Sequence, residues 1–324
     1  MSHDDQKRLN VSAPTRRQMF GAVLAGGAGV ACSTSVSEAA VAKKKDPFSY
    51  CLNTSTIRGQ KIPLVKEIEM ISKAGYDGIE PWLGEINKYT QGGGTLSDLK
   101  KRLSDAGLKV ESAIGFANWV VDDEKRRKKG LEDAKRDMDI VAAIGGTRMA
   151  APPAGATRKG QEIPLPAIAE RYRALLEVGE KAGVVPMLEV WGFSSNLHRL
   201  GQTCYVITEA DHKNACALLD VYHIYKGGSG HAGMKALSES GFPVLHMNDY
   251  PKKPKHEIND SDRVYPGDGV GPLDMILSDM AANGSNAVLS LELFNREYWK
   301  QDANEVVKTG LAKMKAATAK ALGL

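Results

Sequence analysis

The feature that most constrains the fold is a regular alternation of short apolar runs with amphipathic segments from residue 47 onwards. The joints Lys73-Ala74-Gly75, Asp105-Ala106-Gly107 and Lys181-Ala182-Gly183 each precede an apolar run. Gly just after the last helical residue is a common C-terminal cap, so each joint predicts the end of a helix and the start of a strand. Strands that alternate with helices predict parallel pairing through right-handed crossovers.

The apolar runs predict eight strands, at residues 48–52, 78–80, 108–113, 147–150, 184–190, 215–221, 244–247 and 287–293. The amphipathic segments predict eight helices, at residues 63–74, 96–106, 124–144, 165–182, 206–214, 234–240, 273–282 and 304–321. Eight such units favour one α/β domain, a (β/α)8 TIM barrel, over the alternative of a doubly wound open sheet. No glycine-rich fingerprint follows the first predicted strand, which gives a Rossmann domain little support.

The first 42 residues are predicted to be an export signal. Arg16 and Arg17 precede a weakly apolar run rich in Gly and Ala, and Ala40-Val41-Ala42 offers a small-residue cleavage site. The predicted domains are a twin-arginine signal peptide, residues 1–42, and a catalytic barrel, residues 43–324. The protein is therefore expected in the periplasm, exported by the twin-arginine machinery. A lipoprotein anchor at Cys32, an ordinary secretory signal and a basic tail are the alternatives, and the apolar run is too short for a stable membrane span.

Charge and cysteine content exclude several classes of protein. The formal net charge of +4 is small and partly concentrated in short lysine runs, unlike the basic stripe that nucleic acid requires. Cys51, Cys204 and Cys216 show neither zinc-site spacing nor a disulfide framework.

Polar residues interrupt four of the apolar runs near their predicted carboxyl ends: Glu189, Asp220, His246 and Glu292. Unpaired carboxylates are costly to bury, and the carboxyl ends of barrel strands surround one mouth. Three carboxylates and one imidazole at one point need a positive charge between them. We therefore predict one divalent cation bound by these four residues, with Mn²⁺ as first choice and Mg²⁺, Co²⁺ or Zn²⁺ as alternatives. For any one of the three carboxylates considered alone, a salt bridge or a helix cap is the alternative to metal binding.

A longer pattern links these residues to a known family. In order it runs Glu189, Asp220-x-x-His223, His246, Arg263-x-x-Pro266-Gly267-x-Gly269 and Glu292. This pattern resembles the xylose-isomerase-like TIM barrels, which include D-tagatose 3-epimerase, hydroxypyruvate isomerase and inosose dehydratase. The resemblance implies the metal site just described. It also implies that Glu189 and Glu292 transfer protons, while His223 and Arg263 bind substrate oxygens.

The implied activity is a sugar isomerase or epimerase that works through a metal-stabilised enediolate, with a small sugar or sugar derivative as substrate. A lyase or dehydratase acting on a keto-sugar, a 3-keto-glycoside or an inosose is the alternative, because elimination begins with the same deprotonation. A non-catalytic sugar-binding barrel is a second alternative, which the pair Glu189 and Glu292 disfavours. Four aromatic residues fall near strand ends and are expected either to wall an apolar pocket over the sugar ring or to pack with the loops over the barrel mouth: Trp191, Phe193, Trp82 and Trp119.

Overall fold

The alternating apolar runs form parallel strands. The computed structural model describes residues 45–324, and the predicted export motif, Cys32 and the predicted cleavage site lie outside the described residues. Within residues 45–324 one sheet contains eight strands: β1 (Ser49–Asn53), β2 (Gly78–Glu80), β3 (Lys109–Val110), β4 (Arg148–Ala151), β5 (Val185–Glu189), β6 (Ala217–Asp220), β7 (Val244–Met247) and β8 (Val288–Leu291).

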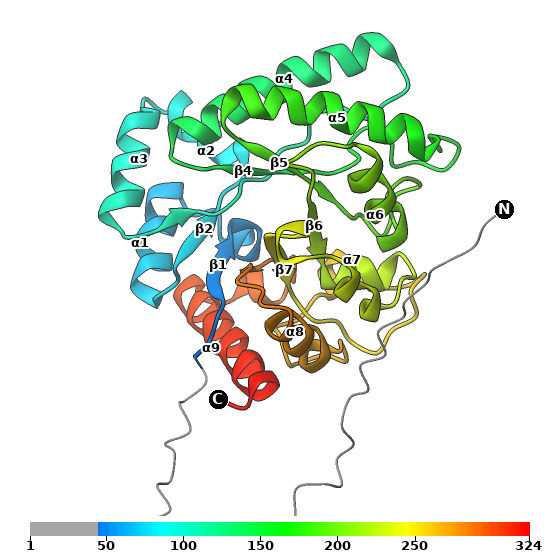
Figure 1. Cartoon of the computed structure of the whole chain (residues 1–324). Coiled ribbons are helices and arrows are strands. Elements are labelled where there is room, and N and C mark those ends of the chain that lie inside the picture. The colour runs from blue at the N-terminus through cyan, green and yellow to red at the C-terminus, as the bar shows by residue number, and fades with distance from the viewer. Residues whose placement is uncertain (1–44) are drawn as a thin grey trace, which may run out of the picture. The chain divides into compact units, whose positions relative to one another are not determined.

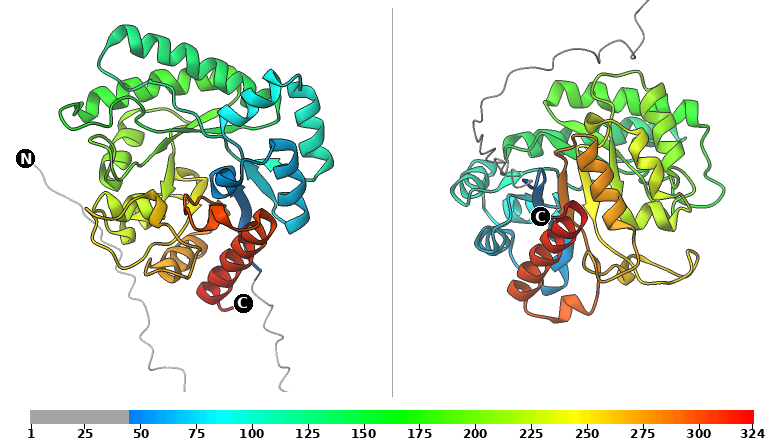
Figure 2. Two further views of the ribbon diagram at one scale, coloured as in Figure 1. Left: turned by 180° about the vertical axis from the view of Figure 1, so that it is seen from behind. Right: turned by 60° about the horizontal axis from the view of Figure 1, so that its bottom comes forward.

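Helices surround this sheet on the outside (Figures 1 and 2). The described helices are α1 (Leu64–Ala74), α2 (Leu83–Gln91), α3 (Leu96–Asp105), α4 (Glu124–Ala143), α5 (Leu165–Ala182), α6 (Leu200–Glu209), α7 (Val221–Lys226), α8 (Leu273–Ala282) and α9 (Ala303–Leu322). Helices α4 and α5 run together along one side, and α9, red in Figure 1, packs against α8, α1 and the blue strand β1.

Strand pairing confirms the predicted barrel over the open-sheet alternative. The order is β3-β2-β1-β8-β7-β6-β5-β4, so that β1 pairs with both β2 and β8. The amide of Ala150 donates a hydrogen bond of 2.9 Å to the carbonyl of Ala113, which joins the β4 end of the sheet to the segment after β3. The predicted caps also form, because Gly75 and Gly183 end α1 and α5 with positive φ angles of 92° and 70°.

Alternation along the strands decides which side chains face the barrel interior. Met187, Leu218 and Val244 pack together inside the barrel, in a cluster separate from the main core under the helices. Because side chains two residues apart share a face, the residues two positions further on also point inwards. They are Glu189, Asp220 and His246. The two-residue repeat of side-chain direction along each strand thus brings these predicted ligands to one end of the barrel interior.

Two predicted helices are wrong in position. The helix expected at residues 206–214 is α6, which begins at Leu200 and ends at Glu209. The amide of Leu200 donates to Ser229 Oγ at 3.0 Å, and Asp211 has a positive φ of 44°, so a distant contact sets the start and a turn follows the end. The helix expected at residues 234–240 is a 3-10 helix at His231–Ala236 instead, and α2 and α7 had no prediction.

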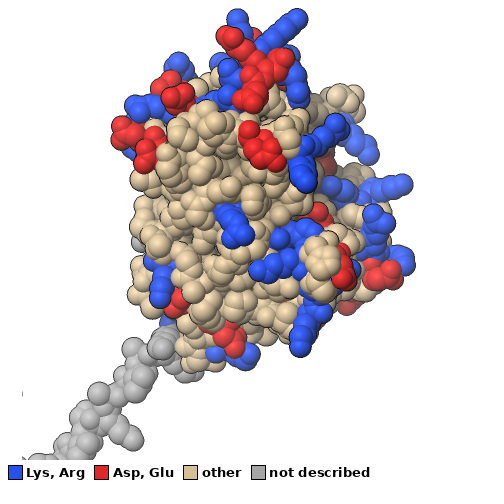
Figure 3. Space-filling view, turned by 90° about the vertical axis from the view of Figure 1, so that its right-hand side faces the viewer, with Lys and Arg blue, Asp and Glu red and all other residues tan. Residues whose placement is uncertain are grey.

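Residues 45–324 contain no candidate membrane-spanning helix and no disulfide bond. Over this range no helix combines the length and the apolar character needed to cross a membrane. Over the same range Cys51, Cys204 and Cys216 are free thiols. On the face shown in Figure 3, Lys and Arg side chains lie among Asp and Glu side chains around a broad uncharged area.

Candidate metal-binding site

The predicted ligands gather at the carboxyl ends of four neighbouring strands. Glu189 and Asp220 are the last residues of β5 and β6. His246 is the third residue of β7, and Glu292 directly follows β8. Strand register aligns them, since Asp220 pairs with His246, and His246 with Ser290. All four predicted ligands are buried, with at most 4% of any of them exposed.

His246 lies at the centre of this cluster. Its Nδ1 atom faces three carboxylate oxygens: Glu292 Oε2 at 3.1 Å, Asp220 Oδ2 at 3.6 Å and Glu189 Oε1 at 3.8 Å. None of these contacts has hydrogen-bond geometry, so Nδ1 is buried without a hydrogen-bond partner among the described residues. An unpartnered nitrogen in front of three carboxylates is the arrangement that a cation would complete.

Glu80, for which no role was predicted from the sequence, contacts the other ring nitrogen of His246, Nε2. Glu80 Oε2 lies 3.1 Å from His246 Nε2 and accepts hydrogen bonds from Asn53 Nδ2 at 2.9 Å and Ser290 Oγ at 2.7 Å. A carboxylate on one ring nitrogen fixes the imidazole so that the other nitrogen faces the ligand position. The signal for Glu80 was present in the sequence, because it too ends a buried strand.

Arg263 closes the cluster on the side of β6 and β8. Its Nη1 donates to Asp220 Oδ2 at 2.9 Å and to Glu292 Oε2 at 2.7 Å, while Nη2 donates to Asp260 Oδ1 at 2.7 Å. Only 1% of this side chain is exposed. Although residues 250–262 separate it from β7 in the sequence, Arg263 thus reaches two of the predicted ligands.

Asp220 is the predicted ligand with the most other partners. Its Oδ2 accepts from Arg263 and, at 3.1 Å, from Asn248 Nδ2, while its Oδ1 accepts from the amide of His223 at 2.7 Å and caps α7. Burial opposes its ionisation, but Arg263 lowers the pKa of Asp220 far below its usual range. Asp220 is thus held as a carboxylate beside His246.

The charges of the buried groups in the cluster favour the binding of a cation. Burial raises the pKa of Glu189 to about 8, and the carboxylates of Glu292 and Asp220 add to the effect. Burial alone would lower the pKa of His246, but Glu292 and Glu80 raise it well above its usual value. Four buried carboxyl groups thus share one buried guanidinium and one imidazole that binds its proton more tightly than usual, and added positive charge lowers their mutual repulsion.

The geometry of three of these residues fits a metal ion. One ligand atom each from Glu189, His246 and Glu292 all lie within 4.8 Å of one another. Ligands at about 2.1 Å from a tetrahedral cation lie about 3.4 Å apart, so small side-chain movements would bring the three atoms into a coordination shell. Oxygen and imidazole ligands suit Mn²⁺, Mg²⁺, Co²⁺ and Zn²⁺.

The loop that carries Arg263 is anchored by Asp249, a second residue without a predicted role. The carboxylate of Asp249 accepts hydrogen bonds from four backbone amides: Tyr250 at 2.8 Å, Gly267 at 3.1 Å, Gly269 at 3.1 Å and Gly271 at 2.7 Å. A Cβ atom on Gly269 would overlap the Asp249 carboxylate, which explains a glycine there. The Pro-Gly-x-Gly phrase therefore binds a carboxylate of its own chain.

The predicted substrate-binding residues lie around the cluster. His223, in α7, is buried, and its Nε2 lies 3.1 Å from Arg263 Nη2. Trp191 follows Glu189 by two positions and contacts Phe193, with ring centroids 5.0 Å apart. Trp119 does not wall the pocket, because this side chain is 1% exposed and packs against Tyr172 in the core.

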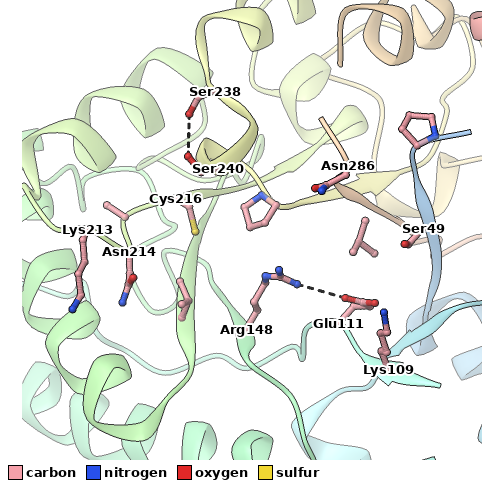
Figure 4. Close-up of a pocket in the computed structure, with 15 residues that line it drawn as sticks. Ser49, Lys109, Glu111, Arg148, Lys213, Asn214, Cys216, Ser238, Ser240 and Asn286 are labelled. Atoms are coloured by element: carbon pink, nitrogen blue, oxygen red, sulfur yellow. Dashed lines mark hydrogen bonds and ion pairs between the residues drawn. The ribbon is translucent and has the colours of Figure 1, made fainter. Parts of the chain in front are cut away.

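A cavity of about 950 Å³ lies at the opposite end of the barrel (Figure 4). Its lining includes the first residues of five strands: Ser49, Lys109, Arg148, Val185 and Val288. Arg148 and Glu111 face each other there at 3.5 Å. TIM-barrel enzymes keep their chemistry at the carboxyl ends of the strands, so the acidic cluster, not this cavity, is the candidate functional site.

The fold and the cluster together define a (β/α)8 barrel with a buried acidic-histidine site. Residues 68–317 match the family described as Xylose isomerase-like TIM barrel, and the chain belongs to this family.

Relatives with known names show what this chain is similar to. Inosose isomerase of Halalkalibacterium halodurans is 28% identical over 266 residues, which cover 81% of this chain and 93% of that protein. 3-Dehydroshikimate dehydratase of Pseudomonas aeruginosa is 25% identical over 235 residues, covering 72% of this chain but 36% of that protein. A crystal structure of the IOLI protein with a bound zinc atom superposes with a TM-score of 0.79 at 24% identity, covering 86% of this chain and 100% of that one.

Proposed function

We propose that this protein is a divalent-metal-dependent isomerase or epimerase of a sugar or a cyclic polyol ketone. The observation that carries the proposal is the buried His246 Nδ1, which faces three carboxylate oxygens and has no hydrogen-bond partner among the described residues. Glu189, Asp220, His246 and Glu292 are the proposed ligands. The cation would polarise the substrate carbonyl and stabilise the charge that develops when the neighbouring C–H bond is broken.

Two carboxylates, Glu189 and Glu292, are proposed to move the proton. Glu189 ends β5 and Glu292 directly follows β8. Strands β6 and β7 separate β5 from β8 in the sheet, so the two carboxylates approach the barrel mouth from two sides. One carboxylate removes the proton from carbon and the other returns a proton on the opposite face. Arg263, whose Nη1 lies 2.7 Å from Glu292 Oε2, is proposed to neutralise the oxyanion of the enediolate.

A lyase or dehydratase is the second candidate. The relative from Pseudomonas aeruginosa named 3-dehydroshikimate dehydratase supports this alternative. Both reactions begin with deprotonation next to a carbonyl and need the same pair of carboxylates. They differ in the second step, where either carbon is reprotonated or an adjacent oxygen leaves.

The test is an exchange experiment in D₂O. The metal-loaded protein is incubated with inososes, ketohexoses and 3-keto-glycosides, and the products are examined by NMR and mass spectrometry. Deuterium at the carbon next to the carbonyl, with no loss of water or aglycone, supports isomerisation. Release of water or an aglycone with a new enone absorbance supports the lyase. Glu189→Gln and Glu292→Gln should each abolish exchange, and exchange that persists in both variants contradicts the proposal.

We further propose that the enzyme acts after export, on the strength of the twin-arginine motif at Arg16 and Arg17. Export by this route would place the site among the glycosides and oxidised sugars outside the cytoplasm.

A further inference from the structure

Five aromatic side chains line one side of the barrel mouth in an unbroken series, called the aromatic arc below: Phe294, Trp82, Phe116, Trp191 and Phe193. Their successive ring centroids are 6.1, 5.1, 6.0 and 5.0 Å apart. Each residue follows the carboxyl end of a strand, namely β8, β2, β3 and β5. The series is longer than one six-membered ring could cover.

The arc is joined to the metal-binding cluster near both ends. Trp82 Nε1 donates to Asn53 Oδ1 at 2.9 Å, and Asn53 Nδ2 donates to Glu292 Oε1 at 3.2 Å. At the other end Phe193 lies 5.7 Å from the ring of His223, which contacts Arg263. A molecule held at the cluster therefore has the arc as its neighbouring wall.

The free surface of the arc belongs mainly to two residues. Phe116 is 43% exposed and Phe193 is 47% exposed, whereas Arg58 covers one face of Trp82, with its guanidinium carbon 3.4 Å from the ring centroid. The whole chain has six Phe and four Trp, and half of them lie in the arc. Exposed aromatic surface concentrated at the mouth of a polar site marks the place where an apolar part of a ligand binds.

This division of chemistry defines a substrate with two parts. The cluster supplies carboxylates and a guanidinium for a carbonyl and its hydroxyl, and the arc supplies flat apolar faces beyond it. The four proposed ligands are at most 4% exposed, whereas Phe116 and Phe193 are 43% and 47% exposed, so these two rings lie further out at the mouth than the polar part. A planar aromatic group favours offset or edge-on contact with such rings.

We propose that the substrate is a keto-glycoside with an aromatic aglycone, whose sugar ring lies at the cluster and whose aglycone packs against Phe116 and Phe193. This substrate class rests on the proposed function, because it assumes that the keto-sugar is the part processed at Glu189 and Glu292. It makes Phe116 and Phe193 specificity-determining residues with no part in proton transfer.

The kinetic test compares two substrates that differ in the aglycone, the 4-nitrophenyl and methyl 3-keto-β-D-glucosides. The wild-type enzyme should prefer the aryl substrate by about tenfold or more in kcat/KM, the ratio expected for one or two aromatic contacts. The double variant Phe116→Ala with Phe193→Ala should lose most of this preference through KM, with the methyl substrate changed less than about twofold. Tyr205→Ala is the matched control, since Tyr205 is an exposed aromatic on α6 outside the arc.

A binding measurement separates this inference from the proposed function. Unreactive 4-nitrophenyl β-D-glucoside should quench the tryptophan fluorescence of the wild-type protein, and the double variant should bind it about tenfold more weakly. Such binding without turnover of any keto-sugar contradicts the proposed function and leaves the arc as an aryl site. Turnover of inososes or ketoses without a preference for the aryl substrate overturns the inference and keeps the proposed function. Sedimentation of a dimer that the double variant converts to a monomer also overturns it, because a second copy would then cover the arc.

Discussion

Replacement of Asp249 by asparagine tests how the Arg263 loop is held. The carboxylate accepts four backbone amides, two on each oxygen: Tyr250 and Gly271 on Oδ1, and Gly267 and Gly269 on Oδ2. Asparagine keeps one acceptor oxygen and turns an NH₂ group towards the other two amides. Hydrogen bonds to a charged group contribute about 1.5–3 kcal/mol each, and partial exposure of this loop reduces that value, so we expect Asp249→Asn to destabilise the protein by about 2–4 kcal/mol.

Thermal unfolding followed by circular dichroism measures this loss. The expected decrease in Tm is roughly 5–12 °C. Asp268→Asn is the matched control in the same loop, because Asp268 forms an exposed ion pair with Lys313 and should contribute at most about 1 kcal/mol. If the two variants lose the same small amount of stability, Asp249 does not anchor the loop and the reasoning is wrong.

Three further predictions concern separate parts of the chain. Glu80→Gln leaves a neutral amide against His246 Nε2, so divalent-metal affinity should fall about 10- to 100-fold in a calorimetric titration, and unchanged affinity would contradict the support assigned to Glu80. Burial raises the pKa of Glu67 from 4.5 to about 9, so the folded protein holds a proton that the unfolded chain releases, and stability falls as pH rises between these values. Glu67→Gln should therefore raise Tm more near pH 8 than near pH 5, and an equal gain at both would count against this carboxyl as the cause. Changing Arg16 and Arg17 together to lysine should keep the protein in the cytoplasm, and fractionation that finds it still exported would exclude the twin-arginine route.

Most of the fold could be predicted because the barrel repeats one local pattern. The predicted bounds of β2, β7, α5 and α8 agree with the structure at both ends. Apolar runs and Gly caps are properties of a few neighbouring residues, which the sequence displays directly. Two helices were misplaced or missed for different reasons. The start of α6 depends on a distant contact with Ser229. Helix α2 has only Leu83 and Ile86 buried, too few to produce a clear helical period in the sequence.

The site was predictable to the extent that it follows from strand ends. Glu189, Asp220, His246 and Glu292 could be grouped because parallel strands of a barrel share one mouth. The partners of these residues could not be assigned in the same way. The contact of Glu80 with His246 joins residues 166 positions apart, and Arg263 reaches Asp220 across 43 positions. Such contacts depend on how the barrel closes, and Glu80 in particular was one strand-end residue among several.

The proposed metal site consists of Glu189, Asp220, His246 and Glu292 and binds one divalent cation. Elemental analysis of the purified mature protein, followed by metal removal and calorimetric reloading, tests it most directly. We expect about one equivalent of divalent metal in the wild-type protein and a strongly reduced metal affinity in His246→Ala. Circular dichroism would check that this variant is folded. Less than about a tenth of an equivalent of any divalent metal, with none taken up on addition, would contradict the account.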